Sequence, residues 1–302
     1  MKRVLVTGSN GLLGQSLVKF FSKEYEVFGA SKGTVDHELD SGIPYYMVDL
    51  AHRGQTLNLI EEVKPDVIIN AGAFTAVDAC ETERELCWNS NVKAVENIIE
   101  ASARFNPALV QISTDYVFDG TNGPYKESDV PNPRGVYARS KFAAENIIKS
   151  CSLEYMIVRT QVLYGVDNRG RLNFASWVID QLAHEKEIRV VGDQVGNPTF
   201  TDDVCEGISR LLKGNDFGVF HISGSEIVSR YQFALKIAEI FELDDSLIQK
   251  ISTEELHQHA PRPMNSSFVL DKLVNRTGWE PHDINSGLML YKSKIEEEYG
   301  RS

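Results

Sequence analysis

A tyrosine and a lysine four residues apart, Tyr137 and Lys141, are the pair in this sequence best suited to proton transfer. On a helix, positions i and i+4 project from one face about 6 Å apart at Cβ. A free tyrosine has a pKa of about 10 and gives up its proton reluctantly at neutral pH. Because a neighbouring ammonium stabilises phenolate, we expect Lys141 to lower the pKa of Tyr137. The pair predicts acid–base chemistry at a carbonyl; a surface tyrosine beside a solvated lysine is the alternative.

Two other segments place small or hydroxyl-bearing residues where strands are expected to end. Residues 110–118, V-Q-I-S-T-D-Y-V-F, predict a buried strand ending in Ser113 and Thr114, either of which could donate to a substrate carbonyl. Capping of the next turn is the alternative for these hydroxyls. Ala71, Gly72 and Ala73 follow Asn70 and leave room for a nicotinamide ribose, although tight sheet packing would select the same residues.

Glycines spaced G-x-x-G-x-x-G follow the first apolar run. Gly8 lets the chain turn, Gly11 lets backbone N–H groups approach a pyrophosphate, and Gly14 lets the helix pack against the strand. The start of that helix offers partial positive charge to the phosphates. The segment predicts a dinucleotide site rather than a plain glycine turn, with these contact residues: Gly8, Asn10, Gly11, Leu12, Leu13 and Gly14.

The end of the second predicted strand bears on the choice of cofactor. It reads G-A-S-K, so Ser31 and Lys32 stand where an acidic residue would bind the ribose 2′-OH of NAD. The cation favours a 2′-phosphate, so NADP(H) is expected and NAD(H) is possible; Asp36 or Asp40 folding back is the alternative. Asp49, with Leu50 beside it, is expected to bind the adenine amine unless it only caps a helix.

Short apolar runs that alternate with amphipathic segments must position these residues. The expected strands are 3–6, 25–29, 45–47, 67–70, 109–113 and 155–159, and the expected helices are 12–21, 55–63, 84–105 and 137–149. This alternation of strands and helices predicts an α/β fold of the Rossmann type, a doubly wound parallel sheet with helices on both faces. Residues 1–167 are expected to form the dinucleotide-binding domain.

The second half loses this regular alternation. Helical patterns occur at 173–184, 202–212, 231–241 and 286–298, and a polar stretch with prolines spans 257–267. We expect residues 168–302 to form mainly a smaller C-terminal substrate-binding lobe that lends residues to a cleft, while later segments may add strands or helices to the first domain.

The totals restrict the partners. The chain has 302 residues and a net charge of −12, which disfavours nucleic acid. Its four cysteines show no ligand spacing, so reduced thiols and no metal are expected. The first apolar stretch is too short for a signal peptide, and no run could span a membrane. A cytoplasmic location, without a membrane or nucleic-acid partner, follows as the expectation, with a homodimer possible.

Taken together, the motifs resemble the extended short-chain dehydrogenase/reductases, and within them the dTDP-4-dehydrorhamnose reductases. The similarity runs through T-G-S-N-G-L-L-G from Thr7, N-A-G-A-F-T-A-V-D from Asn70, S-T-D-Y-V-F-D-G from Ser113, Y-A-R-S-K from Tyr137, N-P-T-F-T-D-D from Asn197 and R-P-M-N-S from Arg262. The glycine loop and Y-x-x-x-K are typical of the superfamily, whereas the third and last segments point to the reductases.

The resemblance implies a catalytic triad of Thr114, Tyr137 and Lys141, and a role for Asn91 in ordering the cofactor site and its water. It also implies contacts to a nucleotide sugar, which we expect from Thr75, Ser113, Thr114, Asp115, Asn173, Gln194, Pro198 and Arg262. Arg262 independently suits a pyrophosphate, with a surface salt bridge as the alternative. Two departures stand out: Val162 replaces a tryptophan that often borders the sugar pocket, and the connection 31–42 is longer than usual.

The expected reaction is NADPH-dependent reduction of the C4 ketone of a nucleotide-linked deoxysugar, most simply dTDP-4-dehydrorhamnose to dTDP-rhamnose, an oxidoreductase step that supplies cell-surface polysaccharide. One alternative is an epimerase or dehydratase of the same superfamily, although Tyr116 rather than a second acid follows Asp115. A non-catalytic subunit is the other alternative, because the chain also resembles the regulatory subunit of methionine adenosyltransferase.

Overall fold

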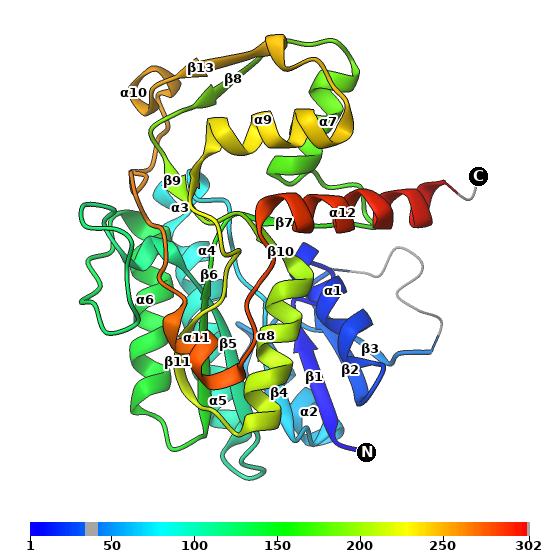
Figure 1. Ribbon diagram of the computed structural model, residues 1–302. Coiled ribbons are helices and arrows are strands. Elements are labelled where there is room, and N and C mark those ends of the chain that lie inside the picture. Colours follow the sequence, from blue (N-terminus) through cyan, green and yellow to red (C-terminus); the bar gives the residue numbers. More distant parts are fainter. Residues whose placement is uncertain (34–41, 301–302) are drawn as a thin grey trace.

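A parallel sheet forms the centre of the protein. In the computed structural model, residues 1–33 and 42–300 are described, and within them the sheet has seven strands. Their bounds are β1 Arg3–Thr7, β2 Glu26–Ser31, β3 Tyr45–Met47, β4 Val67–Asn70, β5 Ala108–Thr114, β6 Tyr155–Thr160 and β11 Gly218–His221. The order across the sheet is β11-β6-β5-β4-β1-β2-β3, and all neighbours run parallel (Figure 1). The predicted Rossmann-type sheet is therefore confirmed.

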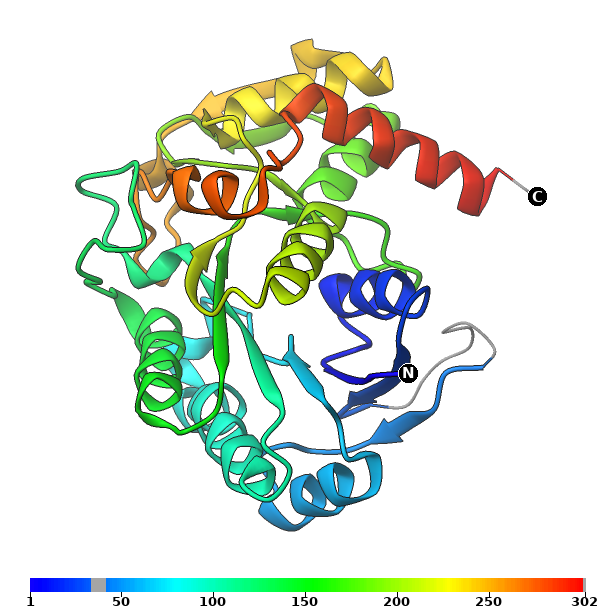
Figure 2. The same cartoon turned by 60° about the horizontal axis from the view of Figure 1, so that its bottom comes forward.

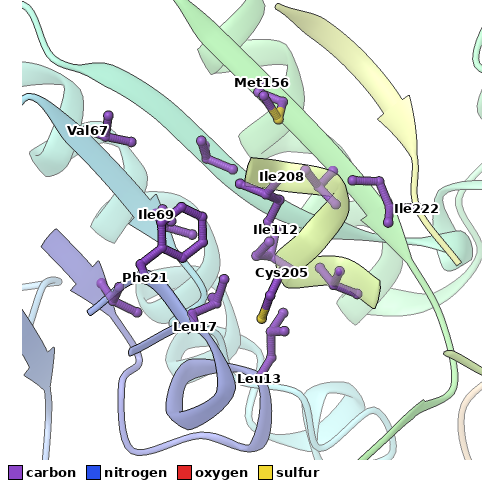
Figure 3. Close-up of a cluster of buried hydrophobic side chains, with 14 of the residues drawn as sticks. Leu13, Leu17, Phe21, Val67, Ile69, Ile112, Met156, Cys205, Ile208 and Ile222 are labelled. Atoms are coloured by element: carbon purple, nitrogen blue, oxygen red, sulfur yellow. The ribbon is translucent and has the colours of Figure 1, made fainter. Parts of the chain in front are cut away.

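Alternation along the strands divides the core into two layers. Val4 and Val6 face one layer, whereas Leu5 between them faces the other. The first layer holds α1 (Leu12–Phe21), α8 (Thr201–Gly214) and α11 (Asp271–Thr277). Figure 3 shows side chains of α1 and α8 meeting those of the sheet there.

The opposite layer is formed by α2 (Arg53–Val63), α5 (Ala94–Ser102) and α6 (Gly135–Ser150). In the view of Figure 2 the sheet passes between this layer and the layer of α1 and α8. Burial on both faces is why the strands are apolar almost throughout.

The helix expected over 84–105 is interrupted. It consists of α4 (Arg84–Trp88), a π-helical turn (Asn89–Lys93) and α5, and the short α3 (Ala79–Thr82) precedes it. The π turn inserts one residue per turn relative to an α-helix and places the buried side chain of Asn91 against α6. Periodicity alone does not reveal such an insertion.

The second half contributes to both parts of the molecule. Its strand β11 is the seventh strand of the central sheet, and its helices α8 and α11 pack on one face of that sheet. No strand was expected at β11, where the apolar Val219 and Phe220 are followed by His221. The remainder forms a separate lobe (Figure 1), and the core of that lobe includes Tyr164, Phe200 and Phe233. Its elements are β7 Leu163–Tyr164, α7 Phe174–Ala183, β8 Ile188–Val191, β9 Val195–Gly196, β10 Thr199–Phe200, β12 Val228–Ser229, α9 Arg230–Phe241, β13 Ile248–Ile251, α10 Thr253–Leu256 and α12 Ile284–Tyr299. Short 3-10 turns occupy Asp115–Val117 and Asp245–Leu247. The division at residue 167 stays a prediction.

Candidate active site

The carboxyl ends of three strands meet at one edge of the sheet. Gly8 follows β1, Gly72 follows β4, and Thr114 ends β5. The strand order reverses at β1, because β2 lies on one side of it and β4 on the other, and open α/β sheets bind ligands at such a point. The residues singled out in the first half of the sequence therefore lie on one side of the molecule.

The glycine loop is shaped by close backbone approaches. Gly8 has a φ of +65°, and a Cβ there would lie 2.5 Å from the backbone nitrogen of Gly72. A Cβ on Gly14 would lie 2.1 Å from the carbonyl oxygen of Gly8. Gly11 caps α1 without a side-chain hydrogen bond, and no acidic residue occupies the first turn. The helix start thus keeps its N–H groups and positive dipole end for an anion, which fits a dinucleotide pyrophosphate.

Neighbouring side chains hold this loop in place. The backbone N–H of Asn10 donates to Ser31 Oγ at 3.0 Å, and Asn10 Nδ2 donates to the Tyr45 hydroxyl at 2.9 Å. Gln15 Nε2 donates to the carbonyl of Asn10 at 3.1 Å and to Asp167 at 3.0 Å. The loop is therefore fixed to the second strand and, through Gln15, to Asp167 at the end of the first half. Leu12 and Leu13 follow it in the first turn of α1.

On the adenosine side, Lys32 and Asp49 lie together. Lys32 Nζ is 2.9 Å from Asp49 Oδ2, and both line a cavity of about 440 Å³. Asp49 Oδ1 also accepts from the N–H of Ala51 at 3.0 Å, so it does stabilise the turn before α2, while the carbonyl of Leu50 accepts from Asn97 at 2.8 Å. The Lys32 ammonium expected to bind a 2′-phosphate therefore lies beside the Asp49 carboxylate. Asp36 and Asp40, the alternative partners, lie outside the described residues.

Tyr137 and Lys141 lie on one face of α6, as the spacing predicted, and both are buried. The hydroxyls of Tyr137 and Thr114 share a hydrogen bond. Lys141 Nζ donates to the carbonyl of Ile112 on β5 at 2.7 Å. This bond holds the ammonium at the sheet, one strand residue before Ser113. The structure thus brings together the three residues that the resemblance named as a triad.

Burial governs the protonation of this pair. It raises the pKa of Tyr137 above its ordinary value, although the hydrogen bond with Thr114 opposes the shift. Burial lowers the pKa of Lys141 to about 8, against the attraction of Glu145. The direction for Tyr137 is opposite to the expected lowering, because loss of water around the phenol outweighs the charges near it in the ligand-free protein. Tyr137 is therefore held firmly as the protonated donor.

The two strand-end hydroxyls differ in their surroundings. Ser113 Oγ donates to Glu145 Oε1 at 2.7 Å, and that carboxylate also accepts from buried Arg159 at 2.9 and 2.7 Å. Thr114 Oγ1 donates to Asp115 Oδ1 at 3.1 Å and accepts from the N–H of Tyr116 at 3.2 Å. The Ser113 hydroxyl is therefore occupied by the carboxylate of the buried Glu145–Arg159 ion pair. Thr114 is the strand-end hydroxyl that lies beside Tyr137.

Asp115 is buried beside this group. Its Oδ2 accepts from Ser266 Oγ at 2.5 Å across 151 positions of sequence. Burial raises the pKa of Asp115 to about 6, against the lowering effect of Ser266 and of Arg230. The Tyr116 ring packs edge-on against Tyr137, with centroids 5.8 Å apart. Tyr116 and Ser266 belong to the two segments that resemble the reductases, but sequence analysis gave neither of them a role in the site, and no local pattern marked Arg230.

Asn91 links the loop after β4 to the helix of Tyr137. Its Oδ1 accepts from the N–H of Phe74 at 2.7 Å, and its Nδ2 donates to the carbonyl of Phe74 at 3.2 Å and to Ser140 Oγ at 2.9 Å. These bonds occupy the amide inside the protein. Ala71 is likewise fixed, since its N–H donates to the carbonyl of Thr7 at 3.1 Å, and Ala73 and Thr75 continue the loop, Thr75 with an exposed side chain.

The expected substrate residues of the second half lie in two settings. Arg262 Nη2 pairs with Asp78 at 2.7 Å, and its guanidinium centre is 6.0 Å from the Tyr116 ring, which brings it to the site. Asn173 caps α7 through a capping box. Gln194 donates to Thr253 and Gln258 at 3.0 and 2.7 Å, and Pro198 lies between β9 and β10.

The described residues contain neither a metal-binding cluster nor a membrane-spanning helix. No group of three His, Cys, Asp or Glu side chains there could hold a metal ion. Likewise, no helix in the described part of the chain has the length and apolar character to cross a membrane.

Comparison with known proteins gives consistent matches. A family model described as RmlD substrate binding domain matches residues 1–296. A dTDP-4-dehydrorhamnose reductase of Aggregatibacter actinomycetemcomitans is 32% identical, covering 98% of this chain and 100% of its own length. Methionine adenosyltransferase 2 subunit beta of Bos taurus is 30% identical, covering 90% of this chain and 81% of its own. A crystal structure of dTDP-4-dehydrorhamnose reductase from Bacillus anthracis in complex with NADP superposes with a TM-score of 0.87 at 32% identity, covering 97% of this chain and 100% of its own.

Proposed function

We propose that this chain, which belongs to the family of the RmlD substrate binding domain, reduces the C4 ketone of a nucleotide-linked deoxysugar with NADPH. The substrate that fits the relatives' names best is dTDP-4-dehydrorhamnose, giving dTDP-rhamnose. The observation that carries this proposal is the convergence of Thr114, Tyr137 and Lys141 beside a glycine loop built for a dinucleotide.

Each side chain has a separable role in the reaction. NADPH, when bound along the glycine loop, supplies the hydride. Tyr137 donates a proton to the ketone oxygen, and its raised pKa keeps it protonated until then. Thr114 donates a hydrogen bond to the same oxygen as negative charge develops on it. Lys141 stabilises the phenolate that remains and holds the nicotinamide ribose.

Several features support NADPH over NADH. Lys32 directly follows β2. Among the described residues at the end of this strand, none is an acid that could bind the ribose 2′-OH of NAD. The Bacillus anthracis structure contains NADP. A cation at this position suits a 2′-phosphate, with Asp49 keeping the ammonium oriented at 2.9 Å.

The test is a substrate screen. Purified protein is mixed with dTDP-, UDP- and GDP-linked 4-keto sugars, each with NADPH or NADH, and the nicotinamide absorbance is followed. We expect stoichiometric loss of NADPH with dTDP-4-dehydrorhamnose. Absence of turnover with every 4-keto sugar, from protein that still binds NADPH, would contradict the proposal.

A regulatory subunit is the second candidate function. It is favoured by the 30% identity to methionine adenosyltransferase 2 subunit beta over 90% of this chain. The two candidates separate cleanly, because an enzyme consumes NADPH with substrate whereas a regulatory subunit changes only its partner's kinetics. We also propose a cytoplasmic location, since all four cysteines are free thiols. The homodimer stays a prediction.

A further inference from the structure

The loop between β7 and α7, residues 165–173, lies against the glycine loop although it is far away in the sequence. Gln15 of α1 joins the two. Its Nε2 donates to the carbonyl of Asn10 at 3.1 Å and to Asp167 Oδ1 at 3.0 Å, and its Oε1 accepts from the N–H of Asn168 at 2.9 Å. Gln15 is buried, so water does not compete for these bonds. The 165–173 loop therefore has a fixed position beside the loop expected to hold the cofactor.

Arg171 is a cation that the 165–173 loop carries to the glycine loop. Its Nη2 donates to the carbonyl of Asn10, and its Nε donates to Asp167 Oδ2 at 3.0 Å. These two bonds hold the guanidinium just before the start of α1, with about half of the side chain exposed to solvent. Within residues 1–33 and 42–300, no acceptor is bonded to Nη1 of Arg171. This N–H group is therefore left for a ligand.

The charges around Arg171 favour an anion. The start of α1 carries the positive end of the helix dipole, and its first turn contains no acidic residue. Asp167 Oδ2 lies 2.9 Å from Nη2 of Arg171, but Asp167 Oδ1 also accepts from Gln15 and from the N–H of Arg169. One carboxylate thus serves several donors. A cation next to a helix start is unfavourable unless an anion binds between them.

A purely structural role for Arg171 is the competing interpretation. Arg171 and Asp167 are four residues apart, and an ion pair with one exposed member contributes little to stability. Fastening of the 165–173 loop does not require Arg171, because Gln15 already makes three hydrogen bonds between this loop and the start of α1. The additional bond from Arg171 to the Asn10 carbonyl brings a charge to the glycine loop rather than a missing anchor.

We propose that Arg171 binds a phosphate of the dinucleotide and is a cofactor-binding residue contributed by the second half of the chain. The inference deepens the proposed function, because it names a residue that holds the NADPH of that reaction. Guanidinium N–H groups match phosphate oxygens in geometry and charge. Two phosphates are within the reach of this place, the pyrophosphate at the start of α1 and the 2′-phosphate beside Lys32. Asn10 lies between them, since its own N–H donates to Ser31 at the end of β2 at 3.0 Å.

Titration of the full chain with NADPH and with NADH tests this inference. Arg171→Gln should raise the Kd for NADPH about tenfold, the loss expected for one charge-assisted contact. Arg171→Lys, which keeps the charge but not the fork, should recover part of the affinity. An equal loss for NADH would identify the pyrophosphate as the partner, and a loss confined to NADPH would identify the 2′-phosphate.

Salt dependence separates a phosphate contact from a structural role. Raising NaCl from about 0.05 M to about 0.5 M should weaken NADPH binding less in Arg171→Gln than in the wild type, because the variant has lost one charge contact. The melting temperature of the ligand-free protein should stay close to that of the wild type. A lower melting temperature together with an unchanged salt dependence would assign Arg171 a structural role and overturn the inference.

Arg210→Gln is the matched control. Arg210 lies on α8, is partly exposed and pairs at 2.6 Å with Glu206, four residues earlier, as Arg171 pairs with Asp167. This variant makes the same change in net charge, and its Kd for NADPH and its salt dependence should equal those of the wild type.

A double variant removes a second explanation for a loss of affinity. Arg171→Gln leaves the Asp167 carboxylate without its cation, so repulsion of the phosphate could imitate a lost contact. Arg171→Gln combined with Asp167→Asn should therefore still bind NADPH weakly. Recovery of wild-type affinity in the double variant would overturn the inference, and so would wild-type affinity for both cofactors in Arg171→Gln.

These outcomes are separate from those of the substrate screen. If Arg171→Gln loses NADPH affinity while no 4-keto sugar is reduced, the phosphate contact holds and the proposed reaction fails. If 4-keto sugars are reduced and the KM for NADPH is unchanged in Arg171→Gln, the reaction holds and the contact fails. A wild-type protein that binds neither NADPH nor NADH overturns the contact directly.

Discussion

The hydroxyl of Tyr137 must hold its proton until substrate is bound and must then release it to leave a phenolate. In the free protein, burial raises its pKa, so it is a secure proton donor but a poor phenolate. The reaction needs the phenolate only after the proton has left, when the Lys141 ammonium and the oxidised cofactor can both stabilise it. The chemistry at this residue therefore depends on groups that act at different moments.

Tyr137→Phe removes the donor while keeping the ring that packs against Tyr116 at 5.8 Å. We expect kcat to fall about 100-fold or more, because general acid catalysis contributes factors of about 100 to 10,000. The Kd for NADPH and the melting temperature should stay close to those of the wild type. Near-normal turnover in this variant would show that another group donates the proton.

Lys141 sets an expected pH limit for cofactor binding. Its lowered pKa of about 8 means that the ammonium is charged below that pH and neutral above it. Because only the charged form can both donate to the ribose and stabilise phenolate, the Kd for NADPH should rise as pH increases through about 8. Fluorescence titration between pH 6 and 10 measures this.

Lys141→Arg serves as the comparison, since a guanidinium stays charged across the whole range. The increase in Kd above pH 8 should disappear in this variant, whatever its affinity at neutral pH. The same upturn in both proteins would assign the pH dependence to another group, with Cys87 and Glu145 as the charged or titratable neighbours of Lys141.

Lys32 is expected to set the preference for NADPH. Lys32→Asp should lower the ratio of kcat/KM for NADPH to that for NADH at least about tenfold, because the new carboxylate repels a 2′-phosphate and can accept from a 2′-hydroxyl. The exposed Lys2→Asp, with the same charge change, should leave the ratio unaltered. Equal efficiencies with both cofactors in the wild type would contradict the role of Lys32.

At the scale of elements, two pieces of backbone hold the site in shape. In the glycine loop, Gly8 lies against Gly72 in the loop after β4, and Gly14 lets α1 pack closely on the Gly8 carbonyl. The π turn places Asn91 so that its amide joins the Phe74 loop to α6. The π turn interrupts a regular α-helix, and the loop requires glycines at fixed positions. Both features lie beside the expected cofactor, and such irregularities are common at functional sites.

Gly14→Ala tests the packing of α1. Its Cβ would lie 2.1 Å from the Gly8 carbonyl oxygen and 2.7 Å from Ser9 Cα, so the helix must move from the loop. We expect a loss of about 1–3 kcal/mol in unfolding free energy and a Kd for NADPH raised at least about tenfold. Gly54→Ala in α2, where a Cβ meets only the His52 ring at 3.5 Å, is the control. Unchanged NADPH affinity in Gly14→Ala would show that the close approach is unnecessary.

At the scale of the whole molecule, the chain crosses between two cores. Residues of the second half build β11, α8 and α11 against the sheet and also supply Arg230, Arg262 and Ser266 to the site. The site is therefore complete only when both halves are folded.

We predict net reduction with release of the cofactor, rather than epimerisation with the cofactor retained. The purified protein should contain little nicotinamide, as judged by absorbance of the denatured supernatant, and should consume NADPH one for one with product. Because Val162 stands where a tryptophan often borders the sugar, some activity with related 4-keto sugars is expected. Protein that retains NAD tightly and interconverts two sugars without net change in absorbance would move the chain to the epimerases.

Sequence patterns determined what is local along the chain. The alternation of short apolar runs with amphipathic segments predicted six strands of the sheet, and the glycine spacing predicted the loop. The i,i+4 spacing put Tyr137 and Lys141 on one face of a helix. These features depend on residues within a few positions of one another, where periodicity and backbone sterics are sufficient. The family resemblance then supplied Thr114 and the reaction as expectations.

Only the tertiary structure decided what depends on distant contacts. It committed Ser113 to Glu145 and left Thr114 at Tyr137, it added β11 to the sheet, and it set the direction of the Tyr137 pKa through burial. It also brought Arg230 near Asp115 from over a hundred positions away. Burial and charge are sums over everything that packs around a group, so no pattern in neighbouring residues could reveal them.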